Sequence, residues 1–272
     1  MALILKTLWG IYKTGMEEWR DRRIDGYVFM DNPIYIILVL AGYLYFVLDF
    51  GPKWMKNRPA FNIDKLLIFY NAIQVVYCAY IVLVGTIVIL PIFNLKCEPI
   101  DYSDNYYSVL ILKVCYLYFI LKVIDLLDTV FFILRKKSVQ VTFLHVYHHA
   151  GMVALSWGGT RFVGGGSGVF LGYLNSIVHM FMYAYYLLTV YNKSFKESVW
   201  WKRHITHLQL IQFGFLLILF VGILLQPNCA YPKWVTMLLI PQNLFMFSLF
   251  GDFYYRTYIK AKKKKVEEIK KD

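Results

Sequence analysis

Charged residues are scarce in this 272-residue chain: they make up 17% of it, whereas 59% of the residues are hydrophobic and 19% are aromatic. Soluble domains and disordered chains carry more charge and fewer apolar residues, so the composition excludes both classes. Segments of about ten residues that alternate apolar and polar positions are also missing, which excludes a transmembrane β-barrel. The sequence instead holds apolar runs long enough to cross a hydrocarbon core of about 30 Å. These runs predict an all-α polytopic membrane protein.

An apolar signal-peptide core is likewise missing at the N-terminus, because Lys6 follows directly after Ala2 to Leu5. We therefore expect the first membrane helix to direct insertion and residues 1–32 to form an interfacial segment. Within this segment, residues Glu17 to Asp25 are dense in charge and lie close to several Trp and Tyr residues. That combination favours a short helix in the membrane interface.

Seven apolar segments predict seven membrane-spanning helices in a single domain that covers residues 1–272 without an internal repeat. Prolines mark several ends, since Pro33 opens the first segment, Pro91 closes the second and Pro227 follows the sixth. The predicted spans are 33–50, 64–91, 107–134, 139–158, 168–191, 205–226 and 234–258, followed by a basic tail over 259–272.

Positive charge is abundant, with a formal net charge of +12, and it is distributed unequally between the two sides of the membrane. Nineteen lysines and arginines fall in the first, third and fifth connections and from Arg256 onward, against eight on the other side. The positive-inside rule therefore places the C-terminus in the cytosol. The sequon at Asn192 then lies in a cytosolic connection and should carry no glycan. Because the cations lie between apolar runs, we expect lipid headgroups or an anionic substrate as partners and no nucleic acid.

Cysteine is rare, and this topology divides the four residues between two environments. Cys78 and Cys115 lie within spans, whereas Cys97 and Cys229 lie in the second and sixth connections, on the oxidising side. We predict a Cys97–Cys229 disulfide. Two free thiols remain the alternative, because pairing geometry cannot be read from the sequence.

The few polar residues inside the predicted spans are the most informative, since ionisable groups in a membrane are costly and mark functional sites by default. In the third and fourth predicted spans their spacing places them on one helical face, and the fifth and sixth add polar residues of their own. At about 1.5 Å per residue, all four sets reach a similar depth in the cytosolic half of the membrane. An alternative, in which these groups only pair with one another and hold the helices together, stays open. The sets are Lys122, Asp125, Asp128 and Thr129; His145, His148 and His149; Asn175, His179, Met182, Tyr183 and Tyr186; and His204, Thr206, His207, Gln209 and Gln212.

In their order and spacing, these residues resemble the motifs of very-long-chain fatty acid elongases. The resemblance implies condensation of a long-chain acyl-CoA with malonyl-CoA to 3-oxoacyl-CoA, free CoA and carbon dioxide in the endoplasmic reticulum membrane. It implies no cofactor and no metal ion. It also implies a narrow acyl tunnel, open to the cytosol, inside the seven-helix bundle. The other enzymes of the elongation cycle and a second copy of the chain are candidate partners. The motifs are Lys122-x-x-Asp125-x-x-Asp128-Thr129, His145-Val-Tyr-His148-His149, Asn175-x-x-x-His179-x-x-Met182-Tyr183-x-Tyr185-Tyr186 and Gln209-x-x-Gln212-Phe213.

The resemblance also implies roles for individual residues. His148 would take the acyl group, and His179 would assist decarboxylation or polarise the forming enolate. His145 and His149 would orient or bind substrate, and Asn175 would donate to an oxyanion. Positioning or substrate contacts are expected from a larger set: Lys122, Asp125, Asp128, Arg135, Lys137, Gln140, Tyr185, Lys202, Thr206, Gln209, Gln212 and Arg256.

Two departures from the family pattern and two rival readings accompany this assignment. Asp125 stands where the family commonly has Glu, and the terminal lysines occupy the second and third positions from the end instead of forming a standard dilysine signal. A di-iron desaturase or hydroxylase shares the HxxHH spacing, although such enzymes need more histidines than the six present here. A non-enzymatic transporter or receptor would explain the buried charges as an ion pathway but would leave the aligned histidines without a role.

Overall fold

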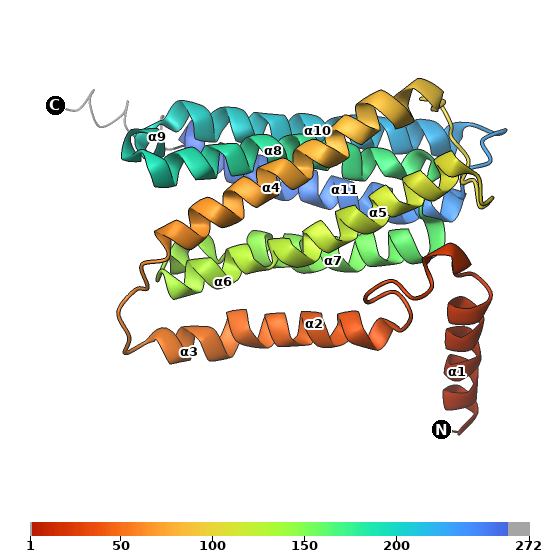
Figure 1. Cartoon of the computed structure of the whole chain (residues 1–272), viewed down its shortest axis with the longest axis horizontal. Helices are drawn as coiled ribbons and strands as arrows, with labels where there is room; N and C mark the ends of the chain where they lie inside the picture. Colours follow the sequence, from red (N-terminus) through yellow and green to blue (C-terminus); the bar gives the residue numbers. More distant parts are fainter. Residues whose placement is uncertain (1, 261–272) are drawn as a thin grey trace. The chain divides into compact units, whose positions relative to one another are not determined.

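The computed structural model describes residues 2–260, which form two compact units (Figure 1). Unit 1 comprises the residues up to Phe61 together with Ile100–Val169, and unit 2 comprises Asn62–Pro99 together with the residues from Phe170 onward. All regular elements among the described residues are helical, as predicted. Most of the predicted basic tail, residues 261–272, lies outside the described residues.

The N-terminal segment starts with helix α1, Ala2–Glu17, and continues into a single 3-10 turn, η1, Arg22–Ile24. The prediction of a short helix over residues 17–25 is therefore wrong, because the helix ends where that prediction begins. Downstream of α1, the Asp21 side chain accepts a hydrogen bond from the backbone of Arg23 at 3.1 Å. Such local side-chain bonds compete with helical hydrogen bonds, and Gly26 follows with a φ of 81°.

Three helical rods build the rest of unit 1. The first runs through α2 (Pro33–Tyr45), the π-helical η2 (Phe46–Phe50) and α3 (Gly51–Met55), so that it extends five residues beyond the predicted span. The second runs through α5 (Tyr106–Asp125) and α6 (Leu127–Leu134), with one irregular residue between them. The third is α7, Phe143–Val163.

Helix α7 starts four residues later and ends five residues later than predicted. Its start is set by Thr142, whose hydroxyl accepts a hydrogen bond from the backbone N–H of His145 at 3.2 Å. The residues just before it, Ser138–Gln140, form the 3-10 turn η5 instead of continuing the helix. A glycine-rich turn follows α7 and contains the 3-10 turn η6, Gly166–Gly168. Gly166 has a φ of 56°, a backbone conformation that favours glycine.

The rods of unit 1 pack closely on one another. Helix α5 lies along α7, α2 also contacts α7, and α3 contacts α6 (Figure 1). Phe119 from α5 and Val153 from α7 are fully buried between them. Ile24 and Met30 of the N-terminal segment join the same hydrophobic cluster, so this segment is part of the unit and not a separate arm.

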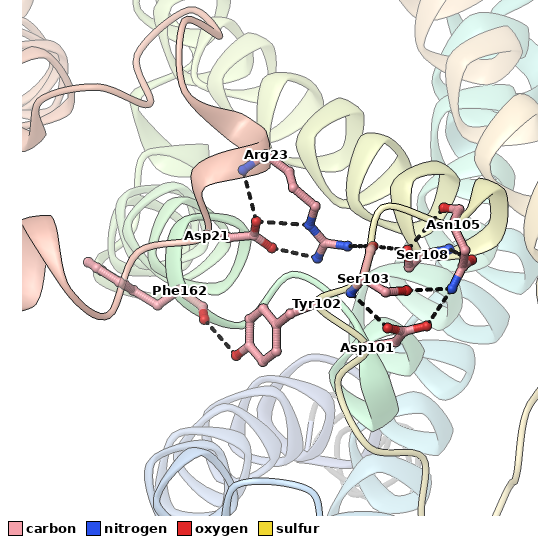
Figure 2. A network of polar contacts seen from close by, with 8 residues as sticks. All are labelled: Asp21, Arg23, Asp101, Tyr102, Ser103, Asn105, Ser108 and Phe162. Carbon is pink, nitrogen blue, oxygen red and sulfur yellow. Dashed lines mark hydrogen bonds and ion pairs between the residues drawn. The ribbon is translucent and has the colours of Figure 1, made fainter.

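A polar network ties the N-terminal segment to the connection before α5 (Figure 2). Arg23 donates from Nε and Nη2 to the Asp21 carboxylate at 2.9 and 2.6 Å, and from Nη1 to the carbonyl of Ser103 at 2.6 Å. The bond to Asp21 raises the pKa of the Arg23 guanidinium. Asp101 accepts from the backbone N–H of Ser103 and from Asn105 Nδ2 at 2.8 and 2.7 Å, and the Ser103 bond is the main cause of a lowered pKa of the Asp101 carboxyl.

The described residues of unit 2 form four long helices and several short elements. The elements are α4 (Asp64–Val84), η3 (Gly85–Ile89), η4 (Leu90–Ile92), α8 (Val169–Tyr191), α9 (Lys193–Glu197), α10 (Val199–Leu225), α11 (Lys233–Tyr254) and η7 (Tyr255–Lys260). The first three follow one another directly and form the α4 rod. Pro91 falls in the last turn of this rod, as expected, whereas Pro241 lies inside α11 and α10 begins six residues before its predicted span.

Close helix contacts and one covalent link hold unit 2 together. A Cβ atom on Gly85 would lie 2.5 Å from the ring of Tyr173, so glycine is required where α8 crosses the α4 rod. Helix α10 packs along α11, and Asn243 Nδ2 donates to the carbonyl of Phe213 at 2.8 Å. Cys97 and Cys229 form a disulfide with Cα atoms 5.7 Å apart, which is the pairing expected from the sequence.

Within residues 2–260, four stretches of helix are long and apolar enough to cross a membrane. They coincide with the first, second, sixth and seventh predicted spans. The other three predicted spans correspond to α5–α6, α7 and α8, the helices that carry most of the buried polar residues, and for these the crossing stays a prediction. The four stretches are Pro33–Met55, Asp64–Ile92, Val199–Leu225 and Lys233–Lys260.

Candidate active site

Three imidazoles lie in contact on the first two turns of α7. The ring centroids of His145 and His149 are 4.3 Å apart, and those of His148 and His149 are 5.4 Å apart. His149 is buried and the other two are half-buried. The i, i+3, i+4 spacing thus produces the shared face that the sequence predicts. The ring of Phe132, from α6, packs on His145 at 5.2 Å.

The motif of the third predicted span is buried in unit 1. Lys122 Nζ donates to Asp125 Oδ2 at 2.8 Å, and both residues are 1% exposed. The ammonium also lies 4.9 Å from the ring centroid of Tyr118. Asp125 therefore reaches the lysine although it is one methylene shorter than the Glu common in the family. Pairing a buried cation with a buried carboxylate lowers the cost of placing either charge in an apolar environment.

One further side chain, that of Tyr43, reaches the histidine cluster through Thr129, and the sequence did not reveal it. Thr129 Oγ1 lies 3.0 Å from His145 Nε2, and Tyr43 OH lies 2.8 Å from the same Thr129 oxygen. Tyr43 comes from α2, in an apolar run where a tyrosine looks like any other packing residue. Its distance of 86 positions from Thr129 along the chain left no spacing signal that could have identified it.

In unit 2, the polar face of α8 is buried. Asn175 and His179 are each 4% exposed, and His179 makes an edge-on ring contact with Tyr183 at 5.7 Å. Tyr183 in turn contacts Tyr70 of α4 at 5.9 Å. Tyr185 is also buried, with its hydroxyl 3.4 Å from the carbonyl of Phe195 in α9.

The residues expected to contact substrate at the cytosolic end differ in exposure. Gln212 and Thr206 of α10 are buried, and the Thr206 hydroxyl donates to the carbonyl of Lys202 at 3.0 Å. Arg256 donates from Nε to Asp252 Oδ1 at 2.8 Å. Gln209, Arg135 and Lys137 are half-buried, whereas Gln140, Lys202 and Arg256 are exposed.

The two histidines left out of the assignment have partners of their own in unit 2. The His204 ring stacks on Trp200 at 4.1 Å, and His207 Nε2 lies 2.7 Å from the hydroxyl of Tyr254. Among residues 2–260, the structure contains no group of three or more His, Cys, Asp or Glu side chains arranged to hold a metal ion.

Comparison with known proteins decides the family. The sequence profile of the GNS1/SUR4 family, also called ELO, matches residues 28–266, a range that contains all four motifs. The chain belongs to the GNS1/SUR4 family. Human very long chain fatty acid elongase 4 is 40% identical over 248 residues, which cover 90% of this chain and 78% of the relative. Mouse very long chain fatty acid elongase 1 is 38% identical over 248 residues, with 89% and 88% coverage, and rat very long chain fatty acid elongase 7 is 36% identical over 251 residues, with 89% and 87% coverage.

The motif residues of this GNS1/SUR4 protein lie in both units. In unit 1, contacts link Tyr43 and Thr129 to the three histidines of α7, and Lys122 pairs with Asp125. Asn175, His179 and Tyr183 line one face of α8 in unit 2. The motif residues thus fall into two groups, one in each unit, whereas Gln140, Lys202 and Arg256 stay exposed outside both.

Proposed function

We propose that this GNS1/SUR4 protein catalyses the condensing step of fatty acid elongation, in which a long-chain acyl-CoA and malonyl-CoA give 3-oxoacyl-CoA, CoA and carbon dioxide. The observation that carries the proposal is the contact cluster of three histidines on α7 in a chain whose relatives are named very long chain fatty acid elongases. Neutral imidazole is a good nucleophile and proton carrier.

In the proposed mechanism, a ring nitrogen of His148 attacks the thioester carbonyl of acyl-CoA. The acyl–nitrogen bond forms, the carbon–sulfur bond breaks, and CoA leaves with a proton. Malonyl-CoA then loses carbon dioxide, and its enolate carbon attacks the acyl-imidazole carbonyl. The carbon–nitrogen bond breaks, 3-oxoacyl-CoA is released, and a proton restores neutral His148. No redox cofactor is needed, because no step changes the total oxidation state.

The resemblance of the α7 motif to that of the elongases favours His148 as the nucleophile. Nε2 of His145 lies 3.0 Å from the Thr129 hydroxyl, a contact that suits a positioning role for His145. His149 would share that role, with the Lys122–Asp125 pair and Asp128 beside the thioester.

The resemblance to the elongase motifs also suggests roles for the remaining residues. His179 would assist decarboxylation or polarise the enolate, and Asn175 would donate to the oxyanion. The phosphates of CoA would meet cations at the cytosolic mouth of an acyl tunnel, and pantetheine would follow the wall of α10. We further propose that the protein resides in the endoplasmic reticulum membrane with its C-terminus in the cytosol, that it acts alongside the other elongation enzymes and that it can form a homodimer. The contacts to CoA would come from Arg135, Lys137, Gln140, Tyr185, Lys202, Thr206, Gln209, Gln212 and Arg256.

The direct test incubates purified protein with labelled malonyl-CoA and a panel of saturated acyl-CoAs. Labelled 3-oxoacyl-CoA should form, and His148→Ala should abolish it. His204→Ala is the matched control, since that histidine stacks on Trp200 outside the proposed site, and it should retain activity. Acyl-CoA alone should leave an acyl adduct on the wild-type protein, detectable by intact mass and absent from His148→Ala. Full activity of His148→Ala would overturn the proposed nucleophile, and no condensation by the wild type would overturn the function.

A further inference from the structure

A chain of two hydroxyl groups connects helix α2 to the histidine cluster. Tyr43 OH lies 2.8 Å from Thr129 Oγ1, which lies 3.0 Å from His145 Nε2. Tyr43 is 7% exposed and Thr129 is 0% exposed, so water cannot readily substitute for either partner. The three residues come from α2, α6 and α7, three helices that pack together within unit 1.

We infer that Tyr43 is a positioning residue which, through Thr129, fixes the tautomer and ring orientation of His145; the inference rests on the condensing activity proposed above. Tyr43 lies outside the four motifs and has no role in the proposed mechanism. It would touch neither substrate nor the reacting atoms. Its effect would reach the site only along this hydrogen-bond chain.

The hydrogen bonds of this hydroxyl chain can run in either of two directions. A hydroxyl donates one hydrogen bond, and neutral imidazole carries its proton on only one of two nitrogens. When Tyr43 donates to Thr129, Thr129 is free to donate to Nε2, and the proton of His145 sits on Nδ1. When His145 donates from Nε2, Thr129 donates onward to Tyr43. In either direction, both hydroxyls and the imidazole are set together, so removal of the Tyr43 hydroxyl releases the Thr129 hydroxyl to rotate.

His145 passes its orientation to the rest of the cluster through ring contacts. Its ring meets His149 at 4.3 Å, and His149 meets His148 at 5.4 Å. Phe132 covers His145 at 5.2 Å, and the Thr142 cap fixes the backbone of the same residue. Ring rotation and proton position are therefore the freedoms left to His145, and these are what the hydroxyl chain restricts.

The test compares Tyr43→Phe with Tyr45→Phe. Both tyrosines lie on α2, but Tyr45 is 62% exposed and serves as the matched control for loss of one phenolic hydroxyl. We expect Tyr43→Phe to lower kcat about tenfold, the loss that one misplaced hydrogen bond typically gives. KM for both CoA substrates should stay within about twofold, because substrate contacts are unchanged. Tyr45→Phe should match the wild type in both constants.

Thr129 variants separate a positioning role from a merely structural one. Thr129→Val keeps the shape but breaks the chain and should lower kcat at least as much as Tyr43→Phe, whereas Thr129→Ser keeps the hydroxyl and should restore most activity. In the double variant, Tyr43→Phe should add little to Thr129→Val, because the two changes break one chain. Thermal unfolding in detergent is measured for each variant. The loss of kcat should be larger than the fraction of unfolded protein at the assay temperature can account for.

Each outcome is decisive. Equal kcat values for Tyr43→Phe and Tyr45→Phe, or independent and multiplicative losses in the double variant, would overturn the positioning role. If Tyr43→Phe does not fold, the comparison of Thr129→Ser with Thr129→Val decides, and equal activity of these two overturns the inference. Absence of labelled product with the wild-type protein is a different result, which counts against the condensing activity itself.

Discussion

Arg161 Nη1 lies 2.8 Å from Asp25 Oδ1, and this ion pair joins the end of α7 to the N-terminal segment. The arginine side chain is 0% exposed, whereas that of Asp25 is 35% exposed and also lies 3.0 Å from Arg20 Nη2. The backbone adds a second link, because the N–H of Asp21 donates to the carbonyl of Arg161 at 2.9 Å. The N-terminal segment is thus clamped to unit 1 by both side chains and main chain.

Asp25→Asn should destabilise the protein, because it removes the negative charge that faces a buried guanidinium. Breaking one partner of such a pair typically costs about 3–5 kcal/mol, and partial exposure of Asp25 reduces this to about 2 kcal/mol, or a Tm lower by about 4–8 °C. Thermal unfolding in detergent measures the shift. Glu17→Gln, which removes an exposed pair with Lys13, is the control and should leave Tm nearly unchanged. A similar Tm for both variants would contradict the clamp.

The Cys97–Cys229 disulfide should produce a mobility difference between reducing and non-reducing gels. The two residues are 132 positions apart, so the disulfide keeps the segment between them closed as a loop even in the denatured chain. The oxidised chain is therefore more compact, and reduction should slow its migration. Cys97→Ser should abolish the difference. Cys115→Ser, which removes a free thiol, should keep it. A difference that survives Cys97→Ser would show that another pairing is present.

Stability should fall at acidic pH, in part through Asp101. The backbone N–H of Ser103 favours the charged carboxylate and lowers its pKa in the folded protein. The resulting stabilisation is fully present above the ordinary carboxyl pKa of about 4 and is lost as the pH falls through the lower, folded-state value. Asp101→Asn should make the dependence of Tm on pH shallower below about pH 4. Asp104→Asn, in the same connection, is the matched control, and an equal flattening by both would refute the assignment to Asp101.

The Lys122–Asp125 pair should tolerate the longer acid but not a neutral side chain. Asp125→Glu, which installs the residue common in the family, keeps a carboxylate beside Lys122 and should retain condensation activity within about threefold. Asp125→Asn removes the charge opposite a 1% exposed ammonium, and a broken buried pair typically costs about 3–5 kcal/mol. Yield of folded protein and condensation rate are the measurements. Equal behaviour of the two variants would show that the carboxylate charge is unimportant.

Local patterns predicted the histidine cluster well, because residues spaced i, i+3 and i+4 on one helix share a face. The same reasoning paired Cys97 with Cys229 through the membrane topology. Sequence reasoning failed for contacts between residues that lie far apart along the chain. Nothing near Tyr43 marks it as a partner of Thr129, since the contact exists only once α2 packs beside α6 and α7.

Helix ends were the other weakness, for a related reason. The Thr142 cap starts α7 later than its apolar pattern, and Asp21 and Gly26 hold an irregular segment where charge density suggested a helix. Side-chain caps and left-handed glycines act through single atoms and torsion angles. Hydropathy averages over windows of many residues and cannot register them.

The bridge between Cys97 and Cys229 also turns the middle of the protein into a covalent circle. All four motifs, from Lys122 to Phe213, lie inside that circle, whereas α1 and α2, with Tyr43, lie outside it. A single proteolytic cut in the connection near α9 would open the circle without releasing either fragment. The residues proposed for chemistry would then stay physically joined until a reductant is added.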